Sequence, residues 1–284
     1  MALTYLDQNA LIGLGRKARV PDFRGKVDSA LESGALSVVV STWHLIETAN
    51  SPRLEPAIEL AEFIDSLRSA WLFERHDILL MEVADDFYTF AHIEHQSASR
   101  VATRSAVIAA LNRTPDSARF NIPSAQFVAQ WWKHRDQLHT LEAAYKHNAE
   151  SLLGIRELKK QGKLTDDVLS KAIQTLLEHT VPTRTPAGLE VGHETRAKYI
   201  AQVKEEAIPT LAIEKAISEH EWDAQGGADR NTLIDKFHLI AALPYVDEIV
   251  SDDGFFHTIY PAAAKTGYVR AALIKNEEFL KRFK

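Results

Sequence analysis

The sequence predicts an α/β protein with a Rossmann-like, three-layer parallel sheet that a large all-helical insertion interrupts. Short apolar runs alternate with stretches of helical periodicity at both ends of the chain, as expected where helices join parallel strands. Between these ends, long stretches carry helical periodicity with Pro and Gly breaks. We therefore expect a discontinuous domain of residues 1–85 and 225–284, and a helical insertion of residues 86–224.

The N-terminal half of the predicted sheet comes from three apolar runs. Leu3–Leu6 is typical of a buried strand that leads into a helix. The run 36–40 is β-branched at three positions and precedes a helix over 43–49. Helical spacing continues over 54–67, and the short apolar run 78–81 is then the expected third strand.

Alternating strands and helices return in the last sixty residues. The pattern predicts a helix over 232–243, a strand near 248–251, a helix around 255–265 and a last strand near 268–273. From about residue 84 to 222 it predicts no strand. The insertion thus separates the two halves of the sheet in sequence.

Composition excludes several classes of function. The chain of 284 residues has no cysteine, which excludes disulfides, thiolate zinc sites and a cysteine nucleophile. The formal net charge of −6 argues against a protein that coats nucleic acid non-specifically. The N-terminus lacks the pattern of a signal peptide and no window has the length of a membrane span, so we expect a cytoplasmic protein without membrane contact.

Acidic residues follow the predicted strands at the edge where open α/β sheets bind ligands. Asp7 follows the first strand, and Asp252 and Asp253 follow the strand near the C-terminus. Glu47 lies in the helix after the second strand, and Asp235 in the first turn of the last long helix. Because the carboxyl ends of parallel strands meet at one edge, we expect these five carboxylates to converge.

Converging carboxylates repel one another, and a hard divalent cation relieves that repulsion. The expected cofactor is Mg²⁺ or Mn²⁺, with Asp7 and Asp253 as direct ligands and Asp235 and Asp252 in the same metal set. Such an ion activates water and stabilises charge on phosphate oxygens. The residues therefore predict metal-assisted hydrolysis of phosphodiester bonds.

These motifs resemble a known family. The segments 5–7, 41–47, 235–242 and 249–253 are similar to the successive acidic motifs of PIN-domain nucleases, and they occur in that family's order. The resemblance covers the two terminal parts of the chain and leaves the insertion unexplained. It implies a Rossmann-like sheet, a metal site, and endoribonuclease activity on RNA in preference to DNA.

Position by position, the family's four catalytic acids match Asp7, Glu47, Asp235 and Asp253. The chain departs from the commoner pattern at Ser251, where threonine is frequent. Asp229 and Asn231 compete with Asp235 for the third position. The polar or basic residues beside the acids are the expected substrate contacts: Asn9, Thr42, Arg230, His238 and Ser251.

Each acid also has a structural alternative. Asp7 can cap the helix that follows it. Glu47 can be a solvated surface carboxylate or form an ion pair with Arg53. Asp235 can stabilise the N-terminus of its helix through the helix dipole. The run 252–254 has the composition of an ordinary turn.

Two further motifs favour structural roles. In the run 92–95 the two histidines are three residues apart, which differs from the His-Glu-x-x-His zinc arrangement, so a helix surface is the better interpretation. The run 131–135, Trp-Trp-Lys-His-Arg, has the composition of a surface for single-stranded nucleic acid. An amphipathic helix that packs its tryptophans inward explains it better.

Two other functions compete with the nuclease. A haloacid-dehalogenase-like phosphatase would use Asp7, Thr42, Lys236 and the Asp252-Asp253 pair. Asn9 argues against it, because such enzymes have a second aspartate at that position as general acid. The other alternative is a catalytically silent scaffold that binds protein. The sequence leaves open a homodimer and an inhibitory protein partner.

Overall fold

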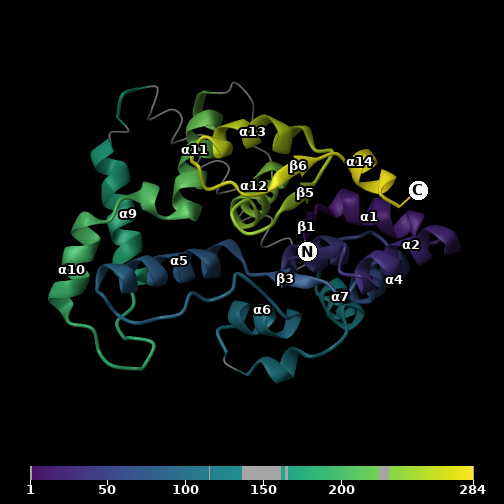
Figure 1. The fold of residues 1–284 in the computed structure, drawn as a ribbon, viewed down its shortest axis with the longest axis horizontal. Helices are drawn as coiled ribbons and strands as arrows, with labels where there is room; N and C mark the ends of the chain where they lie inside the picture. The colour runs from purple at the N-terminus through teal and green to yellow at the C-terminus, as the bar shows by residue number, and fades with distance from the viewer. Residues whose placement is uncertain (1, 115, 136–160, 164–165, 224–229, 284) are drawn as a thin grey trace.

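The computed structural model describes residues 2–114, 116–135, 161–163, 166–223 and 230–283 (Figure 1). Within these residues, six strands form one sheet in the order β4-β3-β2-β1-β5-β6. Every neighbouring pair is parallel except β3 with β4, which is antiparallel. The expected α/β class is confirmed, and the expectation of a purely parallel sheet is wrong at this one edge.

The central strands form where the apolar runs predict them. They are β2 (Ser37–Val40), β1 (Leu3–Leu6) and β5 (Glu248–Val250), and most of their residues are buried. Helices cover both faces of the sheet, so continuous apolar sequence is what these strands need. Asp7 follows β1, at the carboxyl edge of the sheet.

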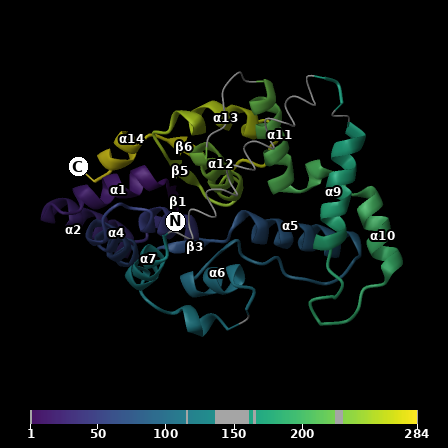
Figure 2. The same cartoon turned by 180° about the vertical axis from the view of Figure 1, so that it is seen from behind.

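The connecting helices form two groups. In chain order the connections are α1 (Gln8–Lys17), α2 (Pro21–Glu32), α3 (Thr42–Ala49), α4 (Leu54–Ser66), α5 (Arg75–Phe90), α12 (Arg230–Ala242) and α13 (Gly254–Ala264), with α14 (Asn276–Lys281) last. Right-handed crossovers put connecting helices on opposite faces when the strand order reverses, as it does between β1 and β5. Accordingly α1 contacts α4, whereas α12 contacts α5 and α13 (Figures 1 and 2).

Two predicted strands are misplaced. The third strand is β3 (Ala70–Leu72), and the apolar run 78–81 lies inside α5 instead. A short apolar run fits a strand or a buried helix equally well, and here Ile78, Leu79 and Val83 face the interior at helical spacing. The last strand, β6 (Ala272–Ile274), begins four residues later than expected, after Tyr268 and Val269.

The expectation of an all-helical insertion is also wrong. β4 (Val101–Ala102) pairs with β3 and extends the sheet, but two residues are too few to show a strand pattern in the sequence. The next elements pack on the main core through Ile108, Phe127 and Val128. These elements are α6 (Arg104–Leu111), the 3₁₀ turn η1 (Ser117–Phe120) and α7 (Ser124–Lys133).

A second hydrophobic cluster lies beyond the sheet. Phe87 of α5 packs there with Leu177, Tyr199 and Leu211. The partner elements are α9 (Asp166–Thr180), α10 (His193–Gln202) and α11 (Pro209–Asp223), and the 3₁₀ turn η2 (Glu205–Ala207) lies between the last two in sequence. Both views show α5 reaching from the sheet to α9 and α10 (Figures 1 and 2). This helix therefore belongs to both cores and runs across position 86, where the insertion was expected to begin.

Candidate active site

Asp7 and the segment after β5 lie side by side at the carboxyl edge of the sheet. Leu6 pairs with Val250 in the parallel ladder, and the backbone N–H of Asp7 donates to the Val250 carbonyl at 3.1 Å. Strand order reverses between β1 and β5, so this is the topological switch point where such sheets bind ligands. The structure thus brings together Asp7, Ser251, Asp252 and Asp253.

The Asp7 carboxylate is held in place and is only 7% exposed. Its Oδ1 accepts a hydrogen bond of 2.6 Å from the Ala10 N–H, so the N-cap role is present. Burial raises the pKa of Asp7, and the charges of Asp253 and Asp252 raise it further. The Ser251 hydroxyl and the Ala10 N–H act in the opposite direction. A cation beside Asp7 would relieve the same repulsion.

The two aspartates after β5 also bind backbone N–H groups. Asp253 Oδ1 accepts from Phe255 at 2.7 Å and caps α13, and Asp252 Oδ1 accepts from Asn276 at 3.1 Å. The Asp253 N–H donates to Ser251 Oγ at 3.0 Å, which links this turn to the hydroxyl beside Asp7. Each of these two bonds uses one oxygen of its carboxylate and fixes the orientation of that side chain.

Glu47 is half-buried in α3 and contributes negative charge to the same region. The charges of Glu47, Glu74 and Asp7 all raise the pKa of the buried Tyr5 hydroxyl, after the larger effect of burial. In the described part of the chain, no ion pair joins Glu47 to Arg53. The ion pair that the sequence suggested for Glu47 is therefore not observed.

The side chains of the candidates for the third acid lie outside the described residues. Asp229 lies outside the described residues. Arg230 and Asn231 begin α12, whereas Asp235 is its sixth residue, so the expectation that Asp235 lies in the first turn is wrong. The side chains of these three residues lie outside the described part. The role of Asp235 as third acid and that of Arg230 as a substrate contact therefore stay predictions.

A network of buried polar side chains lies beneath the acidic edge. His44 Nε2 donates to the Leu6 carbonyl at 2.7 Å, and His44 Nδ1 accepts from the Ser41 N–H at 2.9 Å. This pair of bonds selects the neutral tautomer with its proton on Nε2. Burial lowers the pKa of His44 to about 4. The Tyr5 hydroxyl binds Nδ1 of His238 and lies 3.4 Å from Ser41 Oγ.

The predicted substrate contacts have different environments. His238 is 6% exposed and packs edge-on against Tyr5 and His44, and burial lowers its pKa well below the usual range. Thr42 and Ser251 are buried, and the hydroxyl of Ser251 reaches Asp7. Asn9 is exposed on the first turn of α1.

Sequence reasoning missed Glu74, which follows β3 and begins α5. Burial raises the pKa of Glu74 to about 7, and the side chains of Thr42 and Trp43 bind it and oppose that effect. The signal was an acid shortly after an apolar run, as at Asp7. It was overlooked because the third strand was expected eight residues later.

A groove of about 660 Å³ begins beside the acidic edge. Gln8, the residue after Asp7, and Glu47 lie at one end of it, and its walls come from α1, the end of α3, the 51–53 loop and α4. Arginines line it as well: Arg16, Arg19 and Arg53. The volume is within the range of ligand sites, but the sequence contained no pattern that predicts it.

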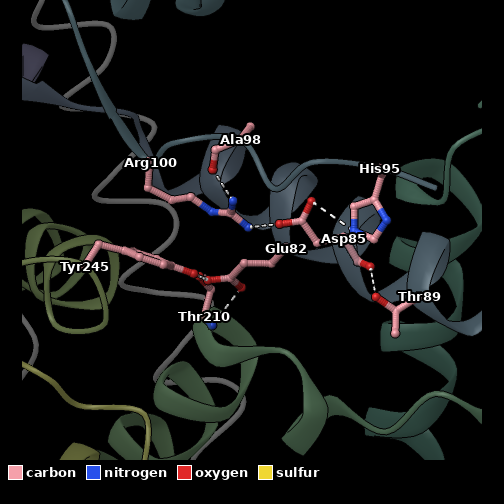
Figure 3. A network of polar contacts seen from close by, with 8 residues as sticks. All are labelled: Glu82, Asp85, Thr89, His95, Ala98, Arg100, Thr210 and Tyr245. Atoms are coloured by element: carbon pink, nitrogen blue, oxygen red, sulfur yellow. Dashed lines mark hydrogen bonds and ion pairs between the residues drawn. The ribbon is translucent and has the colours of Figure 1, made fainter. Parts of the chain in front are cut away.

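A second polar cluster lies away from this edge, between α5 and α11 (Figure 3). Glu82 accepts hydrogen bonds from the Thr210 N–H at 2.9 Å, the Thr210 hydroxyl at 2.7 Å and the Tyr245 hydroxyl. Arg100 donates to Asp85 at 2.8 Å and lies over the Tyr245 ring. The two oxygens of Glu82 are satisfied by these donors, which indicates a structural role.

The donor set at the switch point suits a hard cation. Carboxylate and hydroxyl oxygens from Asp7, Asp253 and Ser251 are ligand types that Mg²⁺ and Mn²⁺ prefer. However, the described side chains include no group of three or more acidic or histidine residues arranged to hold a metal ion. The run 92–95 follows the end of α5 and is not helical, so the expectation of a helix surface is wrong there. His95 lies 3.9 Å from Asp85 and belongs to the second polar cluster.

Comparison with models of known protein families, with curated proteins and with solved structures finds no match. None of the helices in the described residues has the length and apolar character needed to cross a bilayer.

Proposed function

We propose that the protein is a divalent-metal-dependent endoribonuclease whose catalytic acids are Asp7, Glu47, Asp235 and Asp253. One observation carries this proposal: the parallel β1–β5 pair sets Asp7 beside Asp252 and Asp253 at the switch point. Burial raises the pKa of Asp7 and the charges of Asp253 and Asp252 raise it further, which is a reason for a cation to bind there. The proposed cofactor is Mg²⁺ or Mn²⁺, and the proposed location is the cytoplasm.

The residues of the edge have distinct proposed roles. Asp7 and Asp253 would hold the ion through the oxygens that do not cap a helix, with Asp252 and Asp235 beside them. When bound, the ion would stabilise negative charge on the phosphate oxygens of the substrate. The Ser251 side chain forms a hydrogen bond with the Asp7 carboxylate, and its hydroxyl oxygen accepts a hydrogen bond from the Asp253 N–H. Ser251 therefore holds the two acids in fixed positions relative to each other.

RNA, single-stranded or structured, is the proposed substrate, and the choice of RNA over DNA rests on the resemblance to PIN-domain nucleases. The phosphatase alternative is less well supported by the side-chain contacts. The buried Lys236 ammonium donates to Ser218 on α11 at 2.8 Å. One group that a phosphatase would need near Asp7 thus has a partner on α11.

The test is cleavage of labelled single-stranded RNA and DNA by the wild type and by Asp7→Asn, with Mg²⁺, Mn²⁺ or EDTA. Asparagine also caps helices, so the variant keeps the start of α1. We expect metal-dependent cleavage of RNA, slowed at least about a hundredfold in Asp7→Asn, since even weaker perturbations of metal sites cost 10–100-fold. Absence of RNA cleavage, or cleavage that persists in EDTA or in Asp7→Asn, would contradict the proposal.

A further inference from the structure

We propose that the groove along α1, α3 and α4 guides a single RNA strand to the acidic edge, with Arg16 and Arg53 contacting its phosphates. This inference rests on the proposed nuclease function and extends it, because it names where the strand lies. It also predicts which surface of a protein with net charge −6 attracts a polyanion.

The groove follows one face of α1 away from Asp7. Gln8, Ile12, Arg16 and Arg19 lie three or four residues apart, so they share one side of this helix and its C-terminal extension. At 1.5 Å per residue this row extends about 16 Å from the acidic edge. A strand lying along it would pass Glu47 and reach Asp7 at its inner end.

The arginines differ in their readiness to bind phosphate. Arg19 is paired with Glu59 at 2.5 Å across the groove. Arg16 and Arg53 are exposed and make no hydrogen bond or ion pair within the described part of the chain. Guanidinium groups bind phosphate in a bidentate way, which favours these two as contacts. Three glutamates (Glu47, Glu59 and Glu62) also line the groove and match its three arginines in number, so the positive charge is local to Arg16 and Arg53.

The walls are held by contacts that do not involve a ligand. Gln8 Nε2 donates to Thr48 Oγ1 at 3.0 Å, which ties α1 to α3 at the inner end. The indole of Trp132 donates to the Ser51 carbonyl at 3.0 Å and fixes the loop that carries Arg53. A groove that is formed in advance loses less entropy when a strand binds.

The inner end also has an unused hydrogen-bond acceptor. Gln8 Oε1 is buried and finds no donor among the residues that the structure describes. A buried acceptor without a partner costs free energy, which a donor from a bound molecule would recover. The position of this oxygen next to Asp7 is consistent with a strand entering at this end.

Binding of a fluorescent single-stranded RNA, followed by anisotropy in EDTA so that it is not cleaved, tests the groove. The Arg16→Ser/Arg53→Ser variant should bind about tenfold more weakly than the wild type, because charged hydrogen bonds are lost. Its plot of log affinity against log salt should be less steep by about 1.4, from about 0.7 for each lost phosphate contact. The matched control Lys17→Ser/Lys26→Ser removes two exposed charges outside the groove and should change affinity less than about twofold.

The outcomes distinguish a failure of the groove proposal from a failure of the nuclease proposal. Equal affinity of groove variant and wild type, an equal loss in the control, or no RNA binding by the wild type would each overturn the groove proposal. If the wild type cleaves RNA and the groove variant cleaves and binds like it, the nuclease proposal stands without the groove. If the groove variant loses binding but no protein cleaves RNA, the groove stands as a binding site and the nuclease proposal fails. Melting temperatures of all variants verify folding.

Discussion

Burial of single carboxylates governs how they titrate at the carboxyl edge of the sheet. Glu74 has the clearest shift, because it starts α5 in a position shielded from water. Its neighbours Thr42 and Trp43 bind the carboxylate but do not offset the cost of removing its charge from solvent, and Asp77 raises its pKa further. With its pKa near 7, Glu74 exchanges a proton in the physiological range.

This shift predicts a pH-dependent cost in stability. Between pH 4.5 and about 7 the unfolded state releases the Glu74 proton and the folded state retains it, so the free energy of unfolding falls as pH rises. Glu74→Gln removes this effect. Its stability relative to the wild type should rise over this range by up to about 3 kcal/mol, at about 1.4 kcal/mol per pKa unit.

Urea unfolding of wild type and Glu74→Gln at pH 4.5, 6 and 7.5 measures this difference. The exposed Glu62→Gln serves as a matched control and should change stability by less than about 0.5 kcal/mol at each pH. A difference between wild type and Glu74→Gln that stays constant with pH would show that Glu74 is not a buried titrating group.

The ends of helices explain much of the polar structure. Asp7 caps α1 and Asp253 caps α13, so two of the proposed catalytic acids also start helices. α11 begins with Pro209, and a residue from another helix, Glu82, binds the N–H and hydroxyl of Thr210. The first turn of α11 thus depends on α5, which is distant in sequence.

Removal of the Glu82 carboxylate should therefore loosen α11. In Glu82→Ala, the buried donors of Thr210 and Tyr245 lose their acceptor, and we expect a loss of about 3 kcal/mol in the free energy of unfolding. Glu82→Gln retains an acceptor oxygen and should lose clearly less. Urea denaturation of the three proteins measures this. An alanine variant within about 0.5 kcal/mol of the wild type would show that the contacts in Figure 3 do not stabilise α11.

The whole molecule has two hydrophobic clusters that share α5. Ile78 of this helix packs under the sheet, and Phe87 packs against Tyr199 and Leu177 in the second cluster. Separate clusters can open separately, because each has its own buried contacts. The acidic edge and the groove belong to the sheet, at a distance from α9 and α10.

Phe87→Ala should weaken the second cluster by about 3–5 kcal/mol, the usual cost of deleting a large core side chain. We expect faster amide hydrogen exchange in α9 and α10, with slow exchange retained in β1 and β2. The control Leu189→Ala alters an exposed residue and should leave both regions unchanged. Equal acceleration in all elements would show instead that the protein opens as one cooperative unit.

The sequence by itself determined the α/β class and the acids at the switch point. Apolar runs followed directly by Asp7 or by Asp252 and Asp253 are local patterns, and the rules of parallel sheets place such residues at one edge. It did not determine β4, whose two residues are too few to show a pattern, or β3, because the nearby apolar run 78–81 fits a strand as well as the buried face of α5. The acid after β3, Glu74, was missed for the same reason.

Only the tertiary structure decided the surroundings of the acidic edge. The contact of Tyr5 with His238 joins residues 233 positions apart, and the groove needs α1, α3 and α4 packed together. Whether a histidine is buried and neutral, or an arginine unpaired, depends on neighbours that come from distant parts of the chain. Sequence patterns report the local preference of a segment, and these properties arise from long-range packing.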